Sequence, residues 1–199
     1  MKTYIKSTRP GQLDQEVEPA TGHLYYVIGA SGVGKDSLLN YVRPFLSSAP
    51  VVFAHRYITR PVELNGENHV RLSEAEFLSR LQYGCFLFDW QSHGLHYGIG
   101  QEVQDWLDRG LNVVMNGSRG YLPEATLRLP QLRPVLITVA LDKLKTRLEQ
   151  RGRESAEQIQ ERLLRASEFS QLSHPNLTTV SNDGDLTIAG QQLVTVFQQ

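Results

Sequence analysis

The chain has 199 residues, of which 40% are hydrophobic and 21% are charged, and its formal net charge at pH 7 is −1. This composition is typical of one globular domain, and a chain without net positive charge is not expected to bind nucleic acid or an anionic membrane. The one cysteine, Cys85, excludes an internal disulfide, and no apolar run approaches the roughly 20 residues of a membrane helix. We therefore expect a cytoplasmic protein in which Cys85 is buried, and the oligomeric state stays open, with a homodimer among the options.

A glycine-rich segment carries the clearest functional signal. Residues 1–22 are polar and aperiodic, which predicts an N-terminal extension that lies on or off the folded domain and is a candidate for disorder. The apolar run at residues 24–28 predicts a buried strand, and a helical pattern begins at Leu38. Between them, the spacing G-x-x-x-x-G-K predicts a P-loop, whose backbone N–H groups surround a phosphate of a nucleoside triphosphate while Lys35 supplies a cation. The predicted nucleotide-binding residues of this loop are Gly29, Ala30, Ser31, Gly32, Val33, Gly34, Lys35, Asp36 and Ser37.

One position of the loop departs from the P-loop pattern. The residue after the lysine is usually Ser or Thr, whose hydroxyl binds Mg²⁺, whereas this chain has Asp36 followed by Ser37. A carboxylate is a hard oxygen ligand that suits Mg²⁺ directly or through water. Asp36 and Ser37 are therefore the predicted Mg²⁺ ligands, and the pattern does not decide whether Asp36 contacts the metal directly.

The rest of the chain alternates strand and helix patterns. Strands are predicted at residues 51–58, 86–90, 94–97, 111–116, 135–141 and 178–180. Helices are predicted at residues 73–83, 101–109, 142–152 and 155–169 and after residue 184, with a loop around Asn65-Gly66. Ser73 begins a capping box, Asp142 is a predicted helix cap, and Gly152 is a predicted helix end. Such alternation predicts a mainly parallel sheet with right-handed crossovers.

A second set of residues suits phosphoryl transfer. Arg147 and Arg151 lie four residues apart on one predicted helix, and further arginines follow at Arg153, Arg162 and Arg165. Guanidinium groups stabilise the charge that spreads over a transferring phosphoryl group. The alternative is a solvated helix pair, and spacing alone gives it equal weight. Its acidic surface partners would be Glu149, Glu154 and Glu161. The upstream P-loop favours the phosphate interpretation.

The order of these motifs resembles that of the guanylate-kinase family over about residues 24–199. The matching motifs are the P-loop, Thr59-Arg60-Pro61, Gly94-x-x-Tyr97-Gly98, Arg147-Leu148-x-x-Arg151-Gly152, Arg162-Leu163 and Asn182-Asp183. The resemblance implies an α/β P-loop NTPase of the nucleoside-monophosphate-kinase type, with a mainly parallel sheet and helices on both faces. Within a kinase domain at residues 23–199, it implies a small acceptor-binding subdomain at about residues 55–98 and a helical lid at about residues 142–168.

The same resemblance assigns roles to individual residues. The implied catalytic residues are Lys35, Arg147, Arg151 and Arg162. Asn182 and Asp183 are implied to bind ATP, with Asn182 near the adenine. Arg60 and Tyr97 are implied to hold the phosphate of the acceptor.

Several positions depart from a guanylate kinase. Glu63 replaces a second arginine and His69 replaces a tyrosine. The guanine-reading glutamate has no clean counterpart, because Phe88 falls at its position unless a one-residue deletion brings Asp89 there. A guanine pocket without that carboxylate loses the partner of the N–H donors of the base, which disfavours a purine acceptor.

These departures, together with Asn116-Gly117-Ser118-Arg119, resemble one branch of the family, the ribose 1,5-bisphosphate phosphokinases of phosphonate breakdown. That resemblance implies that ATP with Mg²⁺ phosphorylates a phosphorylated sugar, ribose 1,5-bisphosphate, to give 5-phosphoribosyl 1-diphosphate. The candidate substrate-binding residues are Arg56, Arg60, His69, Tyr97 and Arg119.

Alternatives remain at this point. Arg56 could instead pair with Glu63 or Glu67, and His69 could be a satisfied loop histidine. A guanylate-type nucleoside monophosphate kinase is the first alternative function, and a non-catalytic guanylate-kinase-like binding module is the second.

Overall fold

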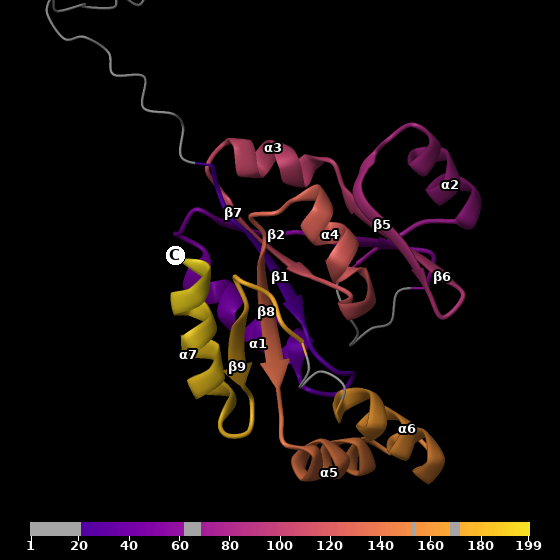
Figure 1. The fold of residues 1–199 in the computed structure, drawn as a ribbon, viewed down its shortest axis with the longest axis vertical. Helices are drawn as coiled ribbons and strands as arrows, with labels where there is room; N and C mark the ends of the chain where they lie inside the picture. The colour runs from indigo at the N-terminus through magenta and orange to yellow at the C-terminus, as the bar shows by residue number, and fades with distance from the viewer. Residues whose placement is uncertain (1–20, 62–68, 153, 168–171) are drawn as a thin grey trace, which may run out of the picture.

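The computed structural model describes residues 21–61, 69–152, 154–167 and 172–199. Several sequence predictions fall outside the described residues. They concern the N-terminal extension up to residue 20, the Asn65-Gly66 loop, Glu63, Glu67, Arg153 and the helix end at residue 169. Figure 1 shows a sheet flanked by helices, with a smaller unit beside it and a helix pair at one end. No helix in the described ranges combines the length and the apolar character needed to cross a membrane.

Within these residues, five parallel strands form the main sheet in the order β2-β7-β1-β8-β9. Their bounds are β1 Leu24–Ile28, β2 Val51–Phe53, β7 Asn112–Asn116, β8 Arg133–Thr138 and β9 Thr178–Ser181. The central strand β1 pairs with β7 on one side and β8 on the other, and all its residues are buried. A parallel strand covered on both faces needs an uninterrupted apolar run, which is what β1 has. The predicted mainly parallel sheet is confirmed.

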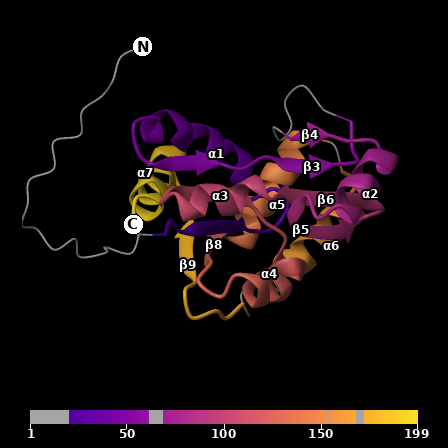
Figure 2. The same cartoon turned by 90° about the horizontal axis from the view of Figure 1, so that it is seen from above.

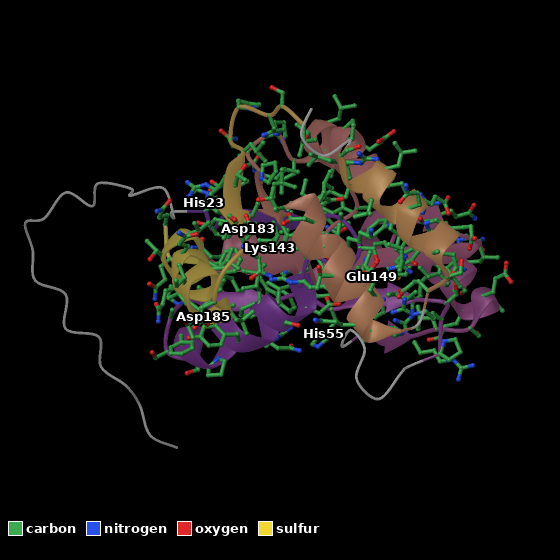
Figure 3. All side chains as sticks on the ribbon, turned by 90° about the horizontal axis from the view of Figure 1, so that it is seen from below. His23, His55, Lys143, Glu149, Asp183 and Asp185 are labelled. Carbon is green, nitrogen blue, oxygen red and sulfur yellow. The ribbon has the colours of Figure 1, made fainter. Side chains whose placement is uncertain are left out.

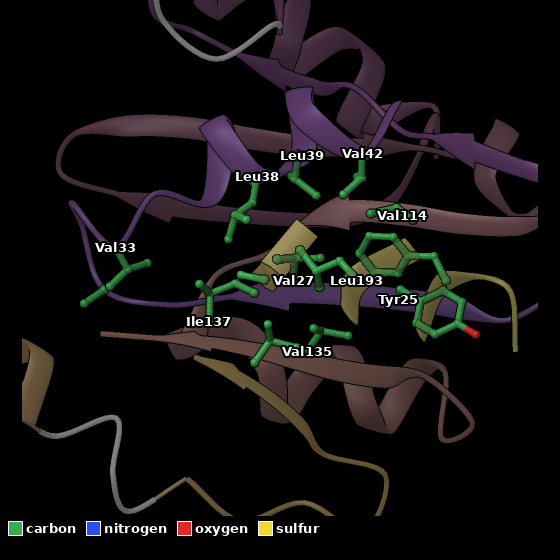
Figure 4. Packing of buried hydrophobic residues seen from close by; sticks show 14 of the residues in the cluster. Tyr25, Val27, Val33, Leu38, Leu39, Val42, Val114, Val135, Ile137 and Leu193 are labelled. Carbon is green, nitrogen blue, oxygen red and sulfur yellow. The ribbon is translucent and has the colours of Figure 1, made fainter. Parts of the chain in front are cut away.

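Helices cover both faces of the main sheet. Tyr25 and Val27 of β1 face helices α1, Lys35–Val42, and α7, Leu186–Phe197, in one buried cluster (Figure 4). The alternate residues of β1 face helices α3, Glu102–Asp108, and α4, Leu122–Arg128, in a second cluster. Figure 2 shows α1 and α4 on opposite sides of the sheet. Helix α4 and the short 3-10 helix η2, Arg119–Tyr121, had no predicted counterpart, because so short a segment shows little periodicity.

A second sheet has the strand order β4-β3-β6-β5 and lies beside the first. Its strands are β3 Arg56–Ile58, β4 Val70–Arg71, β5 Phe86–Ser92 and β6 Leu95–Gly100, and helix α2, Glu74–Gln82, packs against β5. The single strand predicted at residues 51–58 is therefore wrong, because β2 and β3 belong to different sheets. The Ala54 N–H still donates to the Val114 carbonyl of the main sheet at 2.9 Å, and Arg56 already pairs with Ile99 of β6. Strand propensity continues across the break and does not mark the change of sheet.

The predicted helix boundaries were partly right. Ser73 caps α2, with its Oγ accepting from the Glu76 N–H at 3.2 Å, and Gly152 ends α5, Leu141–Arg151, with φ 63°. Asp142 is not the cap of α5, which follows Ala140, and the strand predicted to reach residue 141 ends at Thr138. Helix α6, Ala156–Ser167, follows, and both helices extend from the carboxyl end of β8 (Figure 1). A 3-10 helix η1, Arg43–Leu46, follows α1.

Cys85 is exposed rather than buried, so that prediction is wrong. It lies just before β5, next to an exposed helix end, and the neighbouring Phe86 is the residue that enters the core.

Candidate active site

The P-loop joins β1 to α1 and is closed around its own lysine. Lys35 Nζ donates to the carbonyl oxygens of Gly29 at 2.8 Å and Ala30 at 3.3 Å. Gly34 has φ 91°, and a Cβ atom there would lie 2.6 Å from Nδ2 of Asn182. Glycine is therefore required at this position for two reasons, its backbone conformation and the close approach of Asn182.

Asn182 supports the loop from the end of β9. Its side chain is buried, with 3% of the residue exposed, and its Nδ2 donates to the Val33 carbonyl at 2.7 Å. Its backbone N–H donates to Thr138 of β8 at 2.8 Å. The residue predicted to lie near the adenine thus also fixes the shape of the phosphate-binding loop.

A cavity of about 630 Å³ lies on this side of the P-loop. It is lined by Ser31, Gly32, Gly34, Lys35, Asp36, Ser37, Arg147, Leu148, Arg151, Asn182, Gly184 and Leu186. The structure therefore brings most of the predicted nucleotide-binding residues together with two predicted lid arginines. We call this space the donor cavity, after the predicted nucleotide-binding residues that line it.

Asp183 lies at the edge of this region and is held by several donors. Its carboxylate accepts from the Ala140 N–H and from Ser181 Oγ, both at 2.6 Å, and these bonds lower the pKa of Asp183. Lys143 Nζ donates to the backbone carbonyl of Asp183 at 2.7 Å, and Figure 3 shows the two residues side by side. Asp183 thus accepts a hydrogen bond from the N–H group at the start of α5. This is the capping role that Asp142 was predicted to fill.

Asp36 is oriented by a residue from a neighbouring strand. Its Oδ1 accepts from Nδ2 of Asn116, at the carboxyl end of β7, at 3.1 Å. The carboxylate of Asp36 and the hydroxyl of Ser37 both belong to residues that line the donor cavity. The described residues contain no cluster of three or more His, Cys, Asp or Glu that could hold a metal ion by themselves. Two hard oxygen donors fit a Mg²⁺ ion that takes its remaining ligands from phosphates and water.

Two of the predicted lid arginines contact the P-loop or the residue that supports it. Arg147 Nη2 donates to the carbonyl of Asn182 at 2.8 Å, and Arg162 Nη1 donates to Ser31 Oγ at 2.8 Å. Arg151 and Arg162 both form ion pairs with Glu154, whose side chain is only 4% exposed. Glu154 is therefore not the surface partner of the solvated alternative.

A second cavity, of about 670 Å³, lies on the other side of the P-loop and shares Ser31 with the donor cavity. Gly29 and Ala30 line it from the loop, and the residues after β7 contribute Ser118 and Gly120. The second sheet and helix α6 complete it, and its charged and aromatic lining residues are Arg60, His93, Tyr97, Arg119, Glu161, Arg162 and Arg165. We call this space the acceptor cavity, after the predicted substrate-binding residues Arg60, Tyr97 and Arg119 that line it. Because four of these side chains are cationic, it suits a ligand with more than one negative charge.

Two predicted substrate residues do not line the acceptor cavity but contact residues that do. The Arg56 guanidinium lies 5.3 Å from the ring centre of Tyr97. His69 is buried, and its Nε2 lies 3.1 Å from the carbonyl oxygen of Arg60. Both residues are placed to position Tyr97 and Arg60.

The sequence interpretation missed the support of Tyr97 by Trp90. Their rings stack with centres 5.4 Å apart and an angle of 4°, and Trp90 stacks in turn on Tyr121 at 5.4 Å. Tyr97 and Trp90 pair directly across the β5–β6 hairpin. A turn placed at His93-Gly94 would have predicted that pair from the sequence.

A tyrosine in β1 also fixes the loop after β7. The Tyr26 hydroxyl donates to the Ser118 carbonyl and accepts from the Ser118 N–H, both at 3.0 Å, and burial raises the pKa of Tyr26. A Cβ atom on Gly117 would lie 2.1 Å from the Tyr26 ring. These contacts hold the segment that carries Arg119 into the acceptor cavity.

Neither of the two residues that can fall at the position of the guanine-reading glutamate, Phe88 and Asp89, lines the acceptor cavity. Phe88 is fully buried in the core cluster with Tyr26, and Asp89 Oδ1 lies 3.8 Å from Arg128 Nη1. Among the described residues that line this cavity, Glu161 is the one carboxylate, and it pairs with Arg165. The position that Phe88 fills is thus an apolar core position.

Comparison with known proteins agrees with this arrangement. A family model described as guanylate kinase matches residues 21–199, so the chain belongs to the guanylate kinase family. A crystal structure of guanylate kinase from Anaplasma phagocytophilum has a TM-score of 0.68 at 15% identity, covering 90% of this chain and 86% of that one, and shows the same fold.

Within that family, the chain belongs to the ribose 1,5-bisphosphate phosphokinases. It is 57% identical to "Ribose 1,5-bisphosphate phosphokinase PhnN" of Psychromonas ingrahamii over 180 residues, covering 90% of this chain and 92% of the relative. It is 55% identical to the protein of the same name from Thiobacillus denitrificans over 176 residues, covering 87% and 91%. The resemblance seen in the sequence is confirmed, and the chain is a kinase.

Proposed function

We propose that this protein transfers the γ-phosphoryl group of ATP to the 1-phosphate of ribose 1,5-bisphosphate, giving 5-phosphoribosyl 1-diphosphate. The observation that carries the proposal is the acceptor cavity, which meets the P-loop at Ser31 and presents arginines without a base-reading acid. An acceptor without a base but with two phosphates matches that lining. The names of the relatives support the same acceptor.

The chemistry is direct in-line transfer. Lys35 and the N–H groups of the P-loop hold the donor phosphates, and Arg147, Arg151 and Arg162 stabilise the transferring group. The acceptor oxygen belongs to a phosphate that is already ionised at neutral pH, so no side chain has to remove a proton. The lid at about residues 142–168, of which helices α5 and α6 are described, excludes water from the reacting groups.

Mg²⁺ is the cofactor that the donor cavity fits. When bound, the ion neutralises charge on the donor phosphates. Asp36 and Ser37 would hold it, and Asn116 fixes the Asp36 carboxylate by a hydrogen bond of 3.1 Å. Asn182 and Asp183 contribute to ATP binding in the same region. Asn182 lines the wall of the donor cavity near the adenine, and Asp183 orders the adjoining turn through its bond with Ala140.

The acceptor is held by residues from about 55–98 together with the segment after β7. Arg60, Tyr97 and Arg119 contact its phosphates from the cavity wall. Arg56 positions Tyr97 by lying over its ring, and His69 positions Arg60 through the Arg60 carbonyl.

Product analysis tests this function. The protein is mixed with ATP, Mg²⁺ and one acceptor at a time from ribose 1,5-bisphosphate, ribose 5-phosphate and GMP. We expect 5-phosphoribosyl 1-diphosphate from the first and a rate at least about 100-fold lower with GMP. The reason is that Glu161, the carboxylate of the cavity lining, is already paired with Arg165 and leaves a buried base without an acid partner. GMP as the preferred acceptor would establish a nucleotide kinase instead. Failure to bind ATP with Mg²⁺ would point to a non-catalytic binding module.

Replacing Arg119 with glutamine tests the acceptor site separately. Loss of a charge-assisted hydrogen bond to phosphate is expected to raise KM for ribose 1,5-bisphosphate by about 10-fold or more, with KM for ATP changed less than about 2-fold. Initial rates at varied acceptor and varied ATP measure both values. Arg128→Gln is the matched control, because Arg128 pairs with Asp89 outside the cavity. Equal effects of the two substitutions would remove Arg119 from the acceptor site.

A further inference from the structure

Glu154 occupies a distinct position between the two lid helices. It follows the end of α5 and precedes α6. Its Oε1 lies 2.6 Å from Nη2 of Arg151 and 3.2 Å from Nη2 of Arg162. One carboxylate oxygen thus joins an arginine from each helix.

This carboxylate differs from the other acids of the lid in its burial. The side chain of Glu154 is 4% exposed, whereas those of Glu149, paired with Lys145, and Glu161, paired with Arg165, are 54% and 60% exposed. Exposed ion pairs contribute little to stability, whereas removing one partner of a buried pair leaves an uncompensated charge. The Glu154 carboxylate therefore depends on Arg151 and Arg162, whose own side chains are 42% and 30% exposed, more strongly than the two surface carboxylates depend on their partners.

Both arginines keep N–H donors that Glu154 does not engage and that can bind phosphate. A guanidinium group has five N–H donors in a planar fork, and Glu154 engages one amino group of each. Arg162 uses its other amino group on Ser31 of the P-loop at 2.8 Å. Arg162 thus bridges Glu154 and the phosphate-binding loop, and its orientation is fixed from both ends.

The charges of Arg151 and Arg162 also favour a positioning role for Glu154. Arg151 and Arg162 carry like charges that approach the same atom, so they would repel each other without an anion between them. A buried carboxylate offsets that repulsion and holds both guanidinium groups in one arrangement before the donor phosphates arrive. Cations that are already oriented stabilise a transition state more effectively than cations that must reorient during the reaction.

We propose that Glu154 is a positioning residue for phosphoryl transfer, which aligns Arg151 and Arg162 at the junction of the two cavities by binding one edge of each guanidinium group. The proposal rests on the proposed function in so far as these arginines serve the transferring phosphate. It adds an acidic residue, buried within a cluster of cations, to the machinery that binds anions.

Glu154→Gln tests the proposal, because it keeps the size of the side chain and removes its charge. We expect kcat to fall by about 10-fold or more and the affinity for ATP with Mg²⁺ to weaken by about 3-fold or more, since both arginines lose their alignment. Steady-state rates with ribose 1,5-bisphosphate give the first value and calorimetric titration of ATP without acceptor gives the second. Glu149→Gln, on the same lid but exposed, is expected to change neither by more than about 2-fold.

Two further variants separate positioning from folding. Glu154→Asp keeps the charge and is expected to recover much of the ATP affinity and turnover that Glu154→Gln loses. In an Arg162→Lys background, Glu154→Gln should cost less than about 3-fold further in kcat, because the residue through which it acts is already altered. Thermal unfolding of each variant reports on the fold, and if Glu154→Gln does not fold, the aspartate variant with ATP titration carries the test.

Three outcomes would overturn the proposal. Activity of Glu154→Gln equal to that of Glu149→Gln would remove its role, and so would full additivity with Arg162→Lys. Tighter ATP binding in Glu154→Gln would mean that Glu154 competes with the phosphates for the arginines. If the unaltered protein made no product from any acceptor, the proposed function would fail, while the ATP titrations of the same variants would still decide the role of Glu154.

Discussion

Lys35→Ala is expected to lower turnover by about 1,000-fold or more, because a cation preorganised at the donor phosphates supplies transition-state stabilisation that water cannot replace. Lys35 Nζ lies against the carbonyls of Gly29 and Ala30, and the side chain is absent from the buried clusters. Its removal should therefore leave the fold intact. Turnover with saturating ATP and ribose 1,5-bisphosphate measures the loss, and thermal unfolding checks the fold.

Lys145→Ala is the matched control for this change. Lys145 lies on α5 and forms an exposed pair with Glu149 at 3.9 Å, so its loss should leave turnover within about 2-fold. A Lys35→Ala protein with near-normal turnover and an unchanged fold would show that Lys35 does not act on the donor phosphates.

Phe197→Ala is expected to have the largest effect on stability, lowering the free energy of unfolding by about 3–5 kcal/mol. Phe197 is fully buried at the end of α7, and its ring lies edge-on to Tyr25 at 5.3 Å and to Phe53 at 6.4 Å. Its removal leaves a cavity between α7 and two strands of the main sheet. Urea-induced unfolding at 25 °C, followed by circular dichroism, measures the difference.

Ile188→Ala on the same helix provides the comparison. Ile188 is 63% exposed, and its truncation should cost no more than about 0.5 kcal/mol. Because α7 packs against α1, which begins at Lys35, the Phe197 variant should also lose ATP binding at temperatures where it begins to unfold. Similar midpoints for the two variants would mean that α7 does not belong to the cooperative core.

The sequence was most informative where function and local structure depend on adjacent residues. The P-loop could be recognised because the strand, the glycines and Lys35 are consecutive, and local chain geometry sets their arrangement. Ser73 and Gly152 marked helix ends for the same reason, since capping involves residues within one turn.

Contacts between distant segments could not be predicted in this way. Asp183 replaces Asp142 at the start of α5 through a bond between residues 43 positions apart, and no local pattern contains that information. The break between β2 and β3 is a change of pairing partner, which strand propensity does not register. The burial of Glu154 depends on how α5 and α6 pack, whereas in sequence it looks like any charged residue of a surface helix.

The break after β2 separates one part of the acceptor cavity from the parallel sheet. Strands β3 to β6 and helix α2 form one continuous length of chain that leaves the parallel sheet after Phe53 and returns to its face at α3. The residues that this unit contributes to the acceptor cavity, among them Arg60 and Tyr97, all lie between the end of β2 and the start of α3. Substitutions within this segment therefore reach Arg60 and Tyr97 without touching the P-loop, whereas Arg119 and the arginines of α6 enter the same cavity from other parts of the chain.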